Sequence, residues 1–474
     1  MKKILLGLAI VSAAGSFTSC KDFLTEEPKL KQSNELTYAT FENLDMAAAA
    51  LPMYMQSASW YDGQFILQSE LRAGNAKNPT SMPGSGRYRN DTQWNYTSNS
   101  TSSCWAYSYY TIARANNVIN NLEGKVTGEV TQQQVDNVKA EALFMRALAH
   151  FDAVITYCQP YNNTTDTLGI PVCLVTEMGQ PARDGKKTVY NQIVKDLLEA
   201  ESLMSDSYTR SDADDKAAVP SKCAIQALLS RVYLYMENWQ GAADYATKVI
   251  NSGKYALATK SEYASMFSAA SAPVGGEIIF EVYGSDKNEY WDGSGWTHLP
   301  YLTALDGSGD ICATKDLYDL YEDGDVRKTL FTKNENDYFY TKYIGKSGWT
   351  QPKPTNVPVL RLSEMYLNRA EAIVNGASVS GTSAEQDLRT IANVRGEKSP
   401  AAATRTGVFT ERRRELAFEG HIVYDYARTN TSLTRTDFDE TKNKDVPYPS
   451  YMWAMPIPKS EMDANPNIEQ NPGY

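Results

Sequence analysis

The sequence predicts a mainly α fold, in which helix pairs similar to tetratricopeptide repeats form a scaffold beside a loop-rich face with a few short strands. Long segments with helical spacing of apolar residues recur between residues 107 and 255 and again between 359 and 395. From about 275 to 358 this spacing gives way to Gly, Asp, Asn and aromatic residues. These two kinds of segment predict a helical scaffold that carries one long loop-rich insertion.

The chain begins with a segment typical of an exported protein. Two lysines precede an apolar run from Ile4 to Ala14, which is too short to span a bilayer, and small residues then lead to Cys20. This order predicts a lipoprotein signal over residues 1–19, cleavage before Cys20 and attachment of lipid to its thiol. An ordinary secretory signal with a coincidental cysteine is the alternative, because Phe17 is imperfect at its position in the cleavage site. Both interpretations predict export.

A flexible tether and a long helical body follow the signal. Residues 20–37 are polar, acidic and Pro-containing, which predicts a flexible spacer between membrane and body. The body, residues 38–474, is expected to be one α domain. Its first helices are predicted at 44–55, 107–122, 135–157 and 189–204.

The clearest repeat unit is residues 221–255. Ser221 marks a helix start, small Ala227 allows close helix approach, and the break at 238–241 separates two helices. Residues 138–204 and 361–394 resemble degenerate copies, so tetratricopeptide-like pairs are expected over about 138–255 and 359–395. Generic helical hairpins are the alternative. In the insertion, only the run 277–283 reads as a strand.

Composition excludes several classes of function. The net charge of -11 argues against binding nucleic acid. Six scattered cysteines and three histidines form no pattern of metal ligands, and no nucleotide-binding or acyl-transfer motif is present. The run 411–415 places two glutamates one helical turn apart with arginines between them, which predicts ion pairs that hold helices together. Asp306, Ser308 and Asp310 place oxygen ligands at alternate positions as in a calcium loop, but Ile311 stands where such a loop needs Gly, so a plain turn is favoured over calcium.

Aromatic side chains are the best candidates for ligand contact. The chain has 31 Tyr and 8 Trp against 13 Phe, so most rings carry a polar group. Tyr290, Trp291, Asp292 and Trp296 lie among glycines and short polar residues. The apolar face of a sugar ring packs on such aromatic rings, and its hydroxyls bond to carboxylates and amides. The alternative is that both tryptophans only fasten the loop to the body.

A second candidate group lies nearer the N-terminus. Trp94 is surrounded by polar and small residues, which predicts a loop position, and Arg72 is close in sequence to further polar side chains. Both are predicted as ligand contacts from residue type and neighbourhood alone.

Several stretches, taken together and in order, resemble the SusD/RagB outer-membrane lipoproteins of Bacteroidetes-type bacteria. The resemblance covers nearly the whole chain and rests on these stretches: CKDFLTEEP (20–28), YYTIARANNVINNL (109–122), AEALFMRALAHFDAV (140–154), GIPVCLVTE (169–177), VYNQIVKDLLEAESLM (189–204), VLRLSEMYLNRAEA (359–372), ERRRELAFEGHIVYDYAR (411–428), MPIPKSEMDANP (455–466) and the terminal QNPGY. The departures from the family pattern are Phe17, the opening Lys21-Asp22, and the run 424–426, where relatives commonly carry Trp or Phe with Asp.

The resemblance implies a tetratricopeptide-like scaffold with a loop-rich ligand-binding face, lipidation at Cys20 and exposure on the outside of the outer membrane. It also implies a partner, a TonB-dependent transporter of the SusC type. Oligosaccharides are the usual ligands in the family, and some members take peptides. The leading hypothesis is therefore non-catalytic capture of an oligosaccharide or polysaccharide nutrient, without cofactor. Peptide binding by the same architecture and glycoside hydrolysis are the alternatives.

Overall fold

The computed structural model describes residues 37–81, 86–99, 104–288, 297–350, 353–438, 440 and 442–474. The predicted signal segment, Cys20 and the tether up to residue 36 lie outside these ranges, as does the stretch 289–296. Within the described ranges, no helix is both long enough and apolar enough to cross a membrane.

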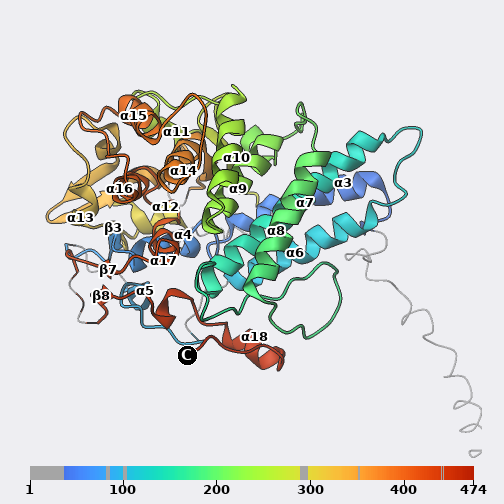
Figure 1. Ribbon diagram of the computed structural model, residues 1–474, viewed down its shortest axis with the longest axis horizontal. Helices are drawn as coiled ribbons and strands as arrows, with labels where there is room; N and C mark the ends of the chain where they lie inside the picture. Colours follow the sequence, from blue (N-terminus) through green and yellow to red (C-terminus); the bar gives the residue numbers. More distant parts are fainter. Residues whose placement is uncertain are drawn as a thin grey trace, which may run out of the picture.

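The fold is mainly α, as the sequence predicts. The helices are α3 (Phe41–Ala49), α4 (Gln64–Arg72), α5 (Arg89–Thr92), α6 (Cys104–Asn121), α7 (Gln132–Tyr157), α8 (Lys186–Leu203), α9 (Lys222–Tyr235), α10 (Trp239–Asn251), α11 (Tyr263–Met266), α12 (Leu299–Thr303), α13 (Lys315–Tyr318), α14 (Leu362–Val374), α15 (Ala384–Arg395), α16 (Arg405–Glu415), α17 (Ile422–Arg428) and α18 (Lys459–Ala464). In Figure 1, α3, α6, α7 and α8 run beside one another at one end, α9 and α10 lie in the middle, and α14 to α17 lie at the other end.

The long helix α7 forms the centre of the first helical layer and contacts both α6 and α8. It begins with a capping box, in which the Thr131 hydroxyl accepts a bond from the Gln134 amide and the Gln134 side chain accepts one from the Thr131 amide. The expected helix over 44–55 is shorter in the structure. It ends at Ala49 and continues as a 3₁₀ turn over Leu51–Gln56, because Pro52 lacks the amide hydrogen that an α-helix needs.

The predicted helix pairs are present as α9 with α10 and α14 with α15. Between the first two, the Asn238 side chain accepts a hydrogen bond from the Gly241 amide and so caps α10. The alanines of α10 allow close approach to α9, where the Ser230 hydroxyl donates to the Ala242 carbonyl at 2.9 Å. Because α10 also contacts α14, the two pairs stack as consecutive units.

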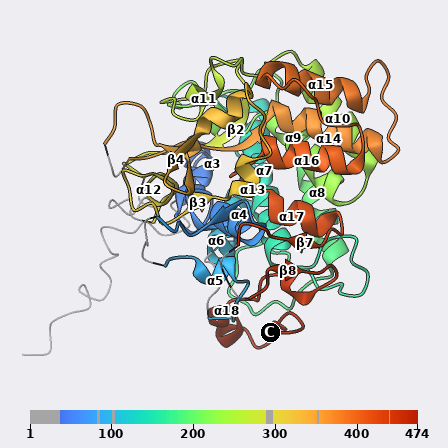
Figure 2. The same ribbon diagram turned by 90° about the vertical axis from the view of Figure 1, so that its left-hand side faces the viewer.

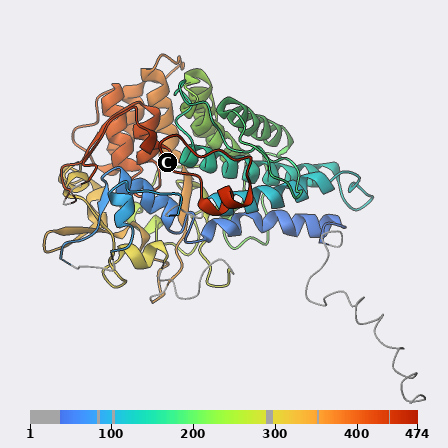
Figure 3. The ribbon, with the colours of Figure 1, turned by 90° about the horizontal axis from the view of Figure 1, so that it is seen from below.

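The structure contains more strand than the sequence predicts, both inside the loop-rich segment and outside it. The strands are β1 (Ala76–Lys77), β2 (Ile278–Val282), β3 (Cys312–Ala313), β4 (Phe331–Asn334), β5 (Asp337–Tyr340), β6 (Val357–Arg361), β7 (Leu433–Thr434) and β8 (Asp445–Val446). The predicted strand is β2, which pairs antiparallel with β6, whereas β1, β3, β5 and β4 form a separate sheet in that order. Figure 2 shows β3, β4 and α12 on one side of the molecule and α14, α15 and α16 on the other. Figure 3 shows the yellow loop-rich segment opposite the green and orange helix pairs.

A buried ion network joins these parts, and its centre is Glu415 at the end of α16. Its carboxylate lies 2.8 Å from Arg395, 3.0 Å from Arg361 and 2.9 Å from Arg327. Burial by itself raises the pKa of Glu415, but the three guanidinium groups hold it well below the usual value. Glu411 also binds Arg327, at 2.6 Å, so the prediction of structural ion pairs for the run 411–415 is confirmed.

Candidate functional site

The predicted ligand-binding loop is represented in the structure by its two ends. Tyr290, Trp291, Asp292 and Trp296 lie outside the described residues. Just before them, the side-chain nitrogen of Asn288 donates to the Met53 carbonyl at 3.0 Å and to the Gln56 side-chain oxygen at 2.7 Å.

After this stretch, the chain is attached to the same N-terminal region. The His298 ring nitrogen Nδ1 lies 2.8 Å from the Asp62 carboxylate, and the Leu299 amide donates to the Asp62 carbonyl at 3.0 Å. All of these side chains are buried. The residues on both sides of the stretch 289–296 are therefore hydrogen-bonded to residues 53–62, which are distant in sequence.

Arg72 and Trp94 lie against each other in the interior. Their side chains are 1% and 3% exposed, the guanidinium lies 4.3 Å from the indole centroid, and the indole nitrogen donates to the Arg72 carbonyl at 2.9 Å. Trp94 does lie just beyond a helix end, but Trp453 packs edge-on against its ring at 5.0 Å. Neither side chain presents a free face to solvent in this structure, and a ligand role for them stays a prediction.

Asp306 and Asp310 each face a cation of the protein. Lys353 lies 3.5 Å from the Asp306 carboxylate, and Arg87 lies 3.4 Å from that of Asp310. Among the residues that the structure describes, no cluster of three or more His, Cys, Asp or Glu side chains could hold a metal ion. The arrangement around these two aspartates is that of a turn with paired charges.

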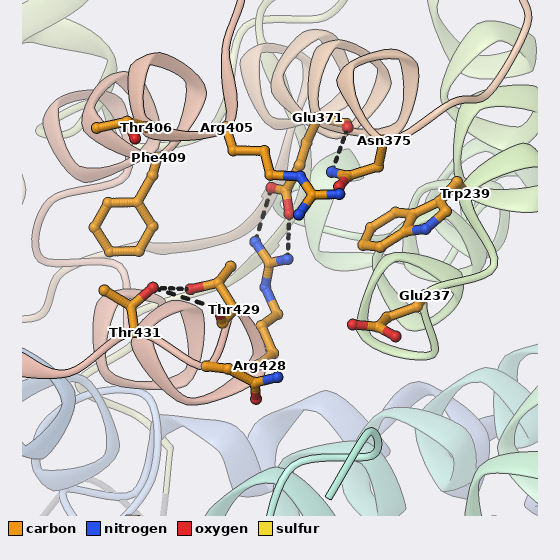
Figure 4. A pocket seen from close by; sticks show the side chains of 11 residues that line it. Glu237, Trp239, Glu371, Asn375, Arg405, Thr406, Phe409, Arg428, Thr429 and Thr431 are labelled. Atoms are coloured by element: carbon orange, nitrogen blue, oxygen red, sulfur yellow. Dashed lines mark hydrogen bonds and ion pairs between the residues drawn. The ribbon is translucent and has the colours of Figure 1, made fainter. Parts of the chain in front are cut away.

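The structure also contains a hollow of about 430 Å³ where four helix ends meet. It lies between the start of α10, the end of α14, the start of α16 and the end of α17. In Figure 4, Trp239 and Phe409 stand on opposite sides of this hollow, and the Glu371–Arg428 pair lies between them. The hollow thus combines two aromatic rings with charged and polar groups, as ligand sites commonly do.

The charges at the base of the hollow balance each other. Glu371 and Arg428 form a two-pronged ion pair with distances of 2.5 and 2.9 Å, and both side chains are buried. Burial by itself lowers the pKa of Arg428, but the carboxylates of Asp425 and Glu371 raise it well above the usual value. This ion pair therefore forms a fixed base of the hollow, in which the two charges neutralise each other.

The side chains at the rim of the hollow form fewer hydrogen bonds and ion pairs than those at its base. Arg405, the first residue of α16, is exposed and forms no hydrogen bond or ion pair with any described residue. Glu237 accepts one hydrogen bond, from Asn162 at 2.8 Å. The hydroxyls of Thr429 and Thr431 lie 2.8 Å apart and bond to each other.

The sequence carries no signal for this hollow. Trp239 belongs to the predicted helix break at 238–241, and no motif singles out Arg405 or Phe409. The lining comes from four segments separated by up to about two hundred residues, and only the folded chain brings them together.

Comparison with known proteins gives matches over both halves of the chain. A family described as "Starch-binding associating with outer membrane" matches residues 22–234, and the SusD family matches residues 326–474. A SusD-like protein P2 of Formosa agariphila is 25% identical over 97% of each chain. The starch-binding protein SusD of Bacteroides thetaiotaomicron is 33% identical over 124 residues, which are 25% of this chain and 22% of that protein.

A solved structure confirms the likeness of the fold. The crystal structure of a SusD superfamily protein from Bacteroides thetaiotaomicron superposes with a TM-score of 0.80 at 27% identity. The superposition covers 91% of this chain and all of the other. The likeness therefore extends over the helix pairs and the loop-rich segment together.

Proposed function

The chain belongs to the SusD/RagB family, and on this premise we propose that it binds oligosaccharide or polysaccharide at the outer membrane, on the outside of the cell. The observation that carries the proposal is the match of residues 22–234 to a family described as starch-binding and associated with the outer membrane. The local match to a starch-binding protein supports the same class of ligand.

The proposed main contact surface is the aromatic stretch 289–296. Trp291 and Trp296 would stack on sugar rings, while Tyr290 and Asp292 would bond to hydroxyls. The buried attachment of Asn288 and His298, which flank this stretch, supports the proposal, because it holds the residues on either side in place.

The proposal includes an anchor and a partner. Lipid on Cys20 would hold the protein at the membrane, and a transporter of the SusC type, driven through TonB, would receive the glycan. The protein itself would bind without breaking bonds. Many weak contacts then set the affinity, and release to the transporter requires no chemical step.

A binding panel tests the proposal. The chain without residues 1–19 is titrated calorimetrically with a set of plant, algal and host polysaccharides and their oligosaccharides. We expect at least one to bind, and we expect Trp291→Ala and Trp296→Ala each to weaken it by about tenfold, which is the effect of losing one stacked ring. Trp349→Ala is the matched control, because this tryptophan is exposed but lies outside the proposed surface.

Three results would count against the proposal. Absence of binding across the panel would reject glycan recognition, and binding of peptides in its place would favour the alternative ligand class. Shortened oligosaccharides after incubation, lost on replacing a single Asp or Glu, would show an enzyme. Equal affinity of the loop variants and the Trp349 control would reject the proposed surface alone.

A further inference from the structure

We propose that the hollow between α10, α14, α16 and α17 is a separate binding site for a sugar ring that carries a carboxylate, such as a hexuronate unit of an acidic glycan. Arg405 would bind the carboxylate, and Trp239 and Phe409 would contact the ring. The choice of a glycan as ligand rests on the proposed function, whereas the carboxylate is inferred from Arg405, which has no partner among the described residues.

The shape of the hollow suits one or two sugar rings. Its volume of about 430 Å³ falls within the usual range of small-molecule sites, about 300–1,000 Å³. Trp239 and Phe409 face it from two sides (Figure 4). Phe409 is held in place by edge-on contact with Tyr426, at 4.9 Å between ring centroids. Fixed aromatic rings provide apolar surface for the C–H face of a sugar at little entropic cost.

The feature of the hollow that favours an anion is one cation, Arg405, on a rim that also carries the Glu237 carboxylate. Glu371 is neutralised by Arg428, so the base attracts neither sign strongly. Arg405 has no partner among the described residues, and a guanidinium matches a carboxylate in a two-pronged geometry. Glu237, held by Asn162, leaves a carboxylate oxygen able to accept bonds from sugar hydroxyls.

This site can be tested apart from the aromatic loop. The residues that line the hollow belong to other elements than the stretch 289–296 and its two anchors. The test therefore uses the chain with Trp291→Ala and Trp296→Ala as its background, so that the proposed main surface contributes little to binding.

The probes are trigalacturonate and its fully methyl-esterified form, which has nearly the same shape without charge. In calorimetric titrations at low salt, we expect the acid to bind about tenfold more tightly than the ester, and Arg405→Gln to remove this preference while leaving the ester unaffected. Trp239→Ala is expected to weaken both probes. Arg389→Gln is the control, because Arg389 is an exposed helical arginine on α15, outside the hollow.

Equal effects of Arg405→Gln and Arg389→Gln on binding of the acid would overturn the proposal, as would equal affinity of the parent background for acid and ester. Binding of an acidic peptide through Arg405 without binding of trigalacturonate would also overturn it. If the unmodified chain binds glycans while the hollow binds no probe, the hollow assignment fails and the proposed function stands. If no glycan binds anywhere, the proposed function fails.

Discussion

Replacing Glu415 with Gln should destabilise the whole fold, because this carboxylate is the shared partner of three buried arginines. The substitution keeps the shape of the side chain but removes its charge, and it turns amide hydrogens toward guanidinium groups that can only donate. Breaking a buried ion pair by removing one partner costs about 3–5 kcal/mol. The unfolding entropy is about 2.1 cal/mol/K per residue, so a body of roughly 430 residues has about 0.9 kcal/mol/K, and the expected fall in unfolding temperature is about 3–6 °C.

Differential scanning calorimetry of parent and variant measures this fall. Glu385→Gln provides the control, because Glu385 forms an exposed pair with Arg389 one turn away on α15, and such pairs contribute little to stability. If Glu415→Gln unfolds within about 1 °C of the control, the network does not stabilise the fold and the reasoning is refuted.

Three further results are expected. Burial raises the pKa of Glu70 from 4.5 to about 7, so its contribution to stability is complete below about pH 4 and is lost as pH rises through about 7. The free energy of unfolding of Glu70→Gln, measured with urea, should therefore rise relative to that of the parent by roughly 3 kcal/mol between about pH 5 and pH 8. A difference between the two proteins that does not change with pH would contradict the assignment. Trp94→Ala should cost about 3–5 kcal/mol in the same assay, because its ring is enclosed by protein, and a variant as stable as the parent would contradict that packing. Gly284→Ala should cost about 1–3 kcal/mol of stability, because its Cβ would overlap the Thr355 backbone beside the β2–β6 pair. Gly128 has open space around it, so Gly128→Ala should leave the stability nearly unchanged. Equal shifts of the unfolding temperature in the two variants would contradict this.

The helices could be predicted because their signals are local. In α7, the cap at Thr131 lies four residues before Val135, the first of many apolar residues at helical spacing, and both signals stand in the sequence. The pair α9 and α10 can be predicted equally well, since Asn238 and Gly241 mark the turn between the two helices in the sequence. The helix predicted over 44–55 was too long at its C-terminal end, and the cause is local as well. Its apolar spacing continues past Pro52, but proline ends an α-helix.

The small sheet was missed because most of its pairings are not local. Strands β1 and β3 have two residues each and pair across more than two hundred positions, so neither carries a periodic signal. The hairpin β4–β5 is an exception, since its strands pair across the two residues 335–336, and Asp337–Tyr340 carries three aromatic residues in a row, which favours a strand.

The burial of Trp94 and the position of the hollow depend on tertiary contacts. Nothing around Trp94 in the sequence indicates that Trp453 will cover its ring. Likewise, Arg405 and Trp239 line the same hollow only because α14 stacks against α10. Residue type indicates which side chains can stack on sugars, whereas which of them lie together depends on the fold.

The position of Glu415 explains how the loop-rich segment is held on the helices. Arg327 comes from that segment, Arg395 from the second helix pair, and Arg361 from the strand between them. A buried ion pair tolerates displacement poorly, because a guanidinium that moves away leaves a carboxylate uncompensated in a dry interior. Movement of the segment against the helices would break several such pairs at once, whereas apolar contacts alone would permit sliding at lower cost. We therefore infer that buried charge fixes the orientation between the loop-rich segment and the helix pairs.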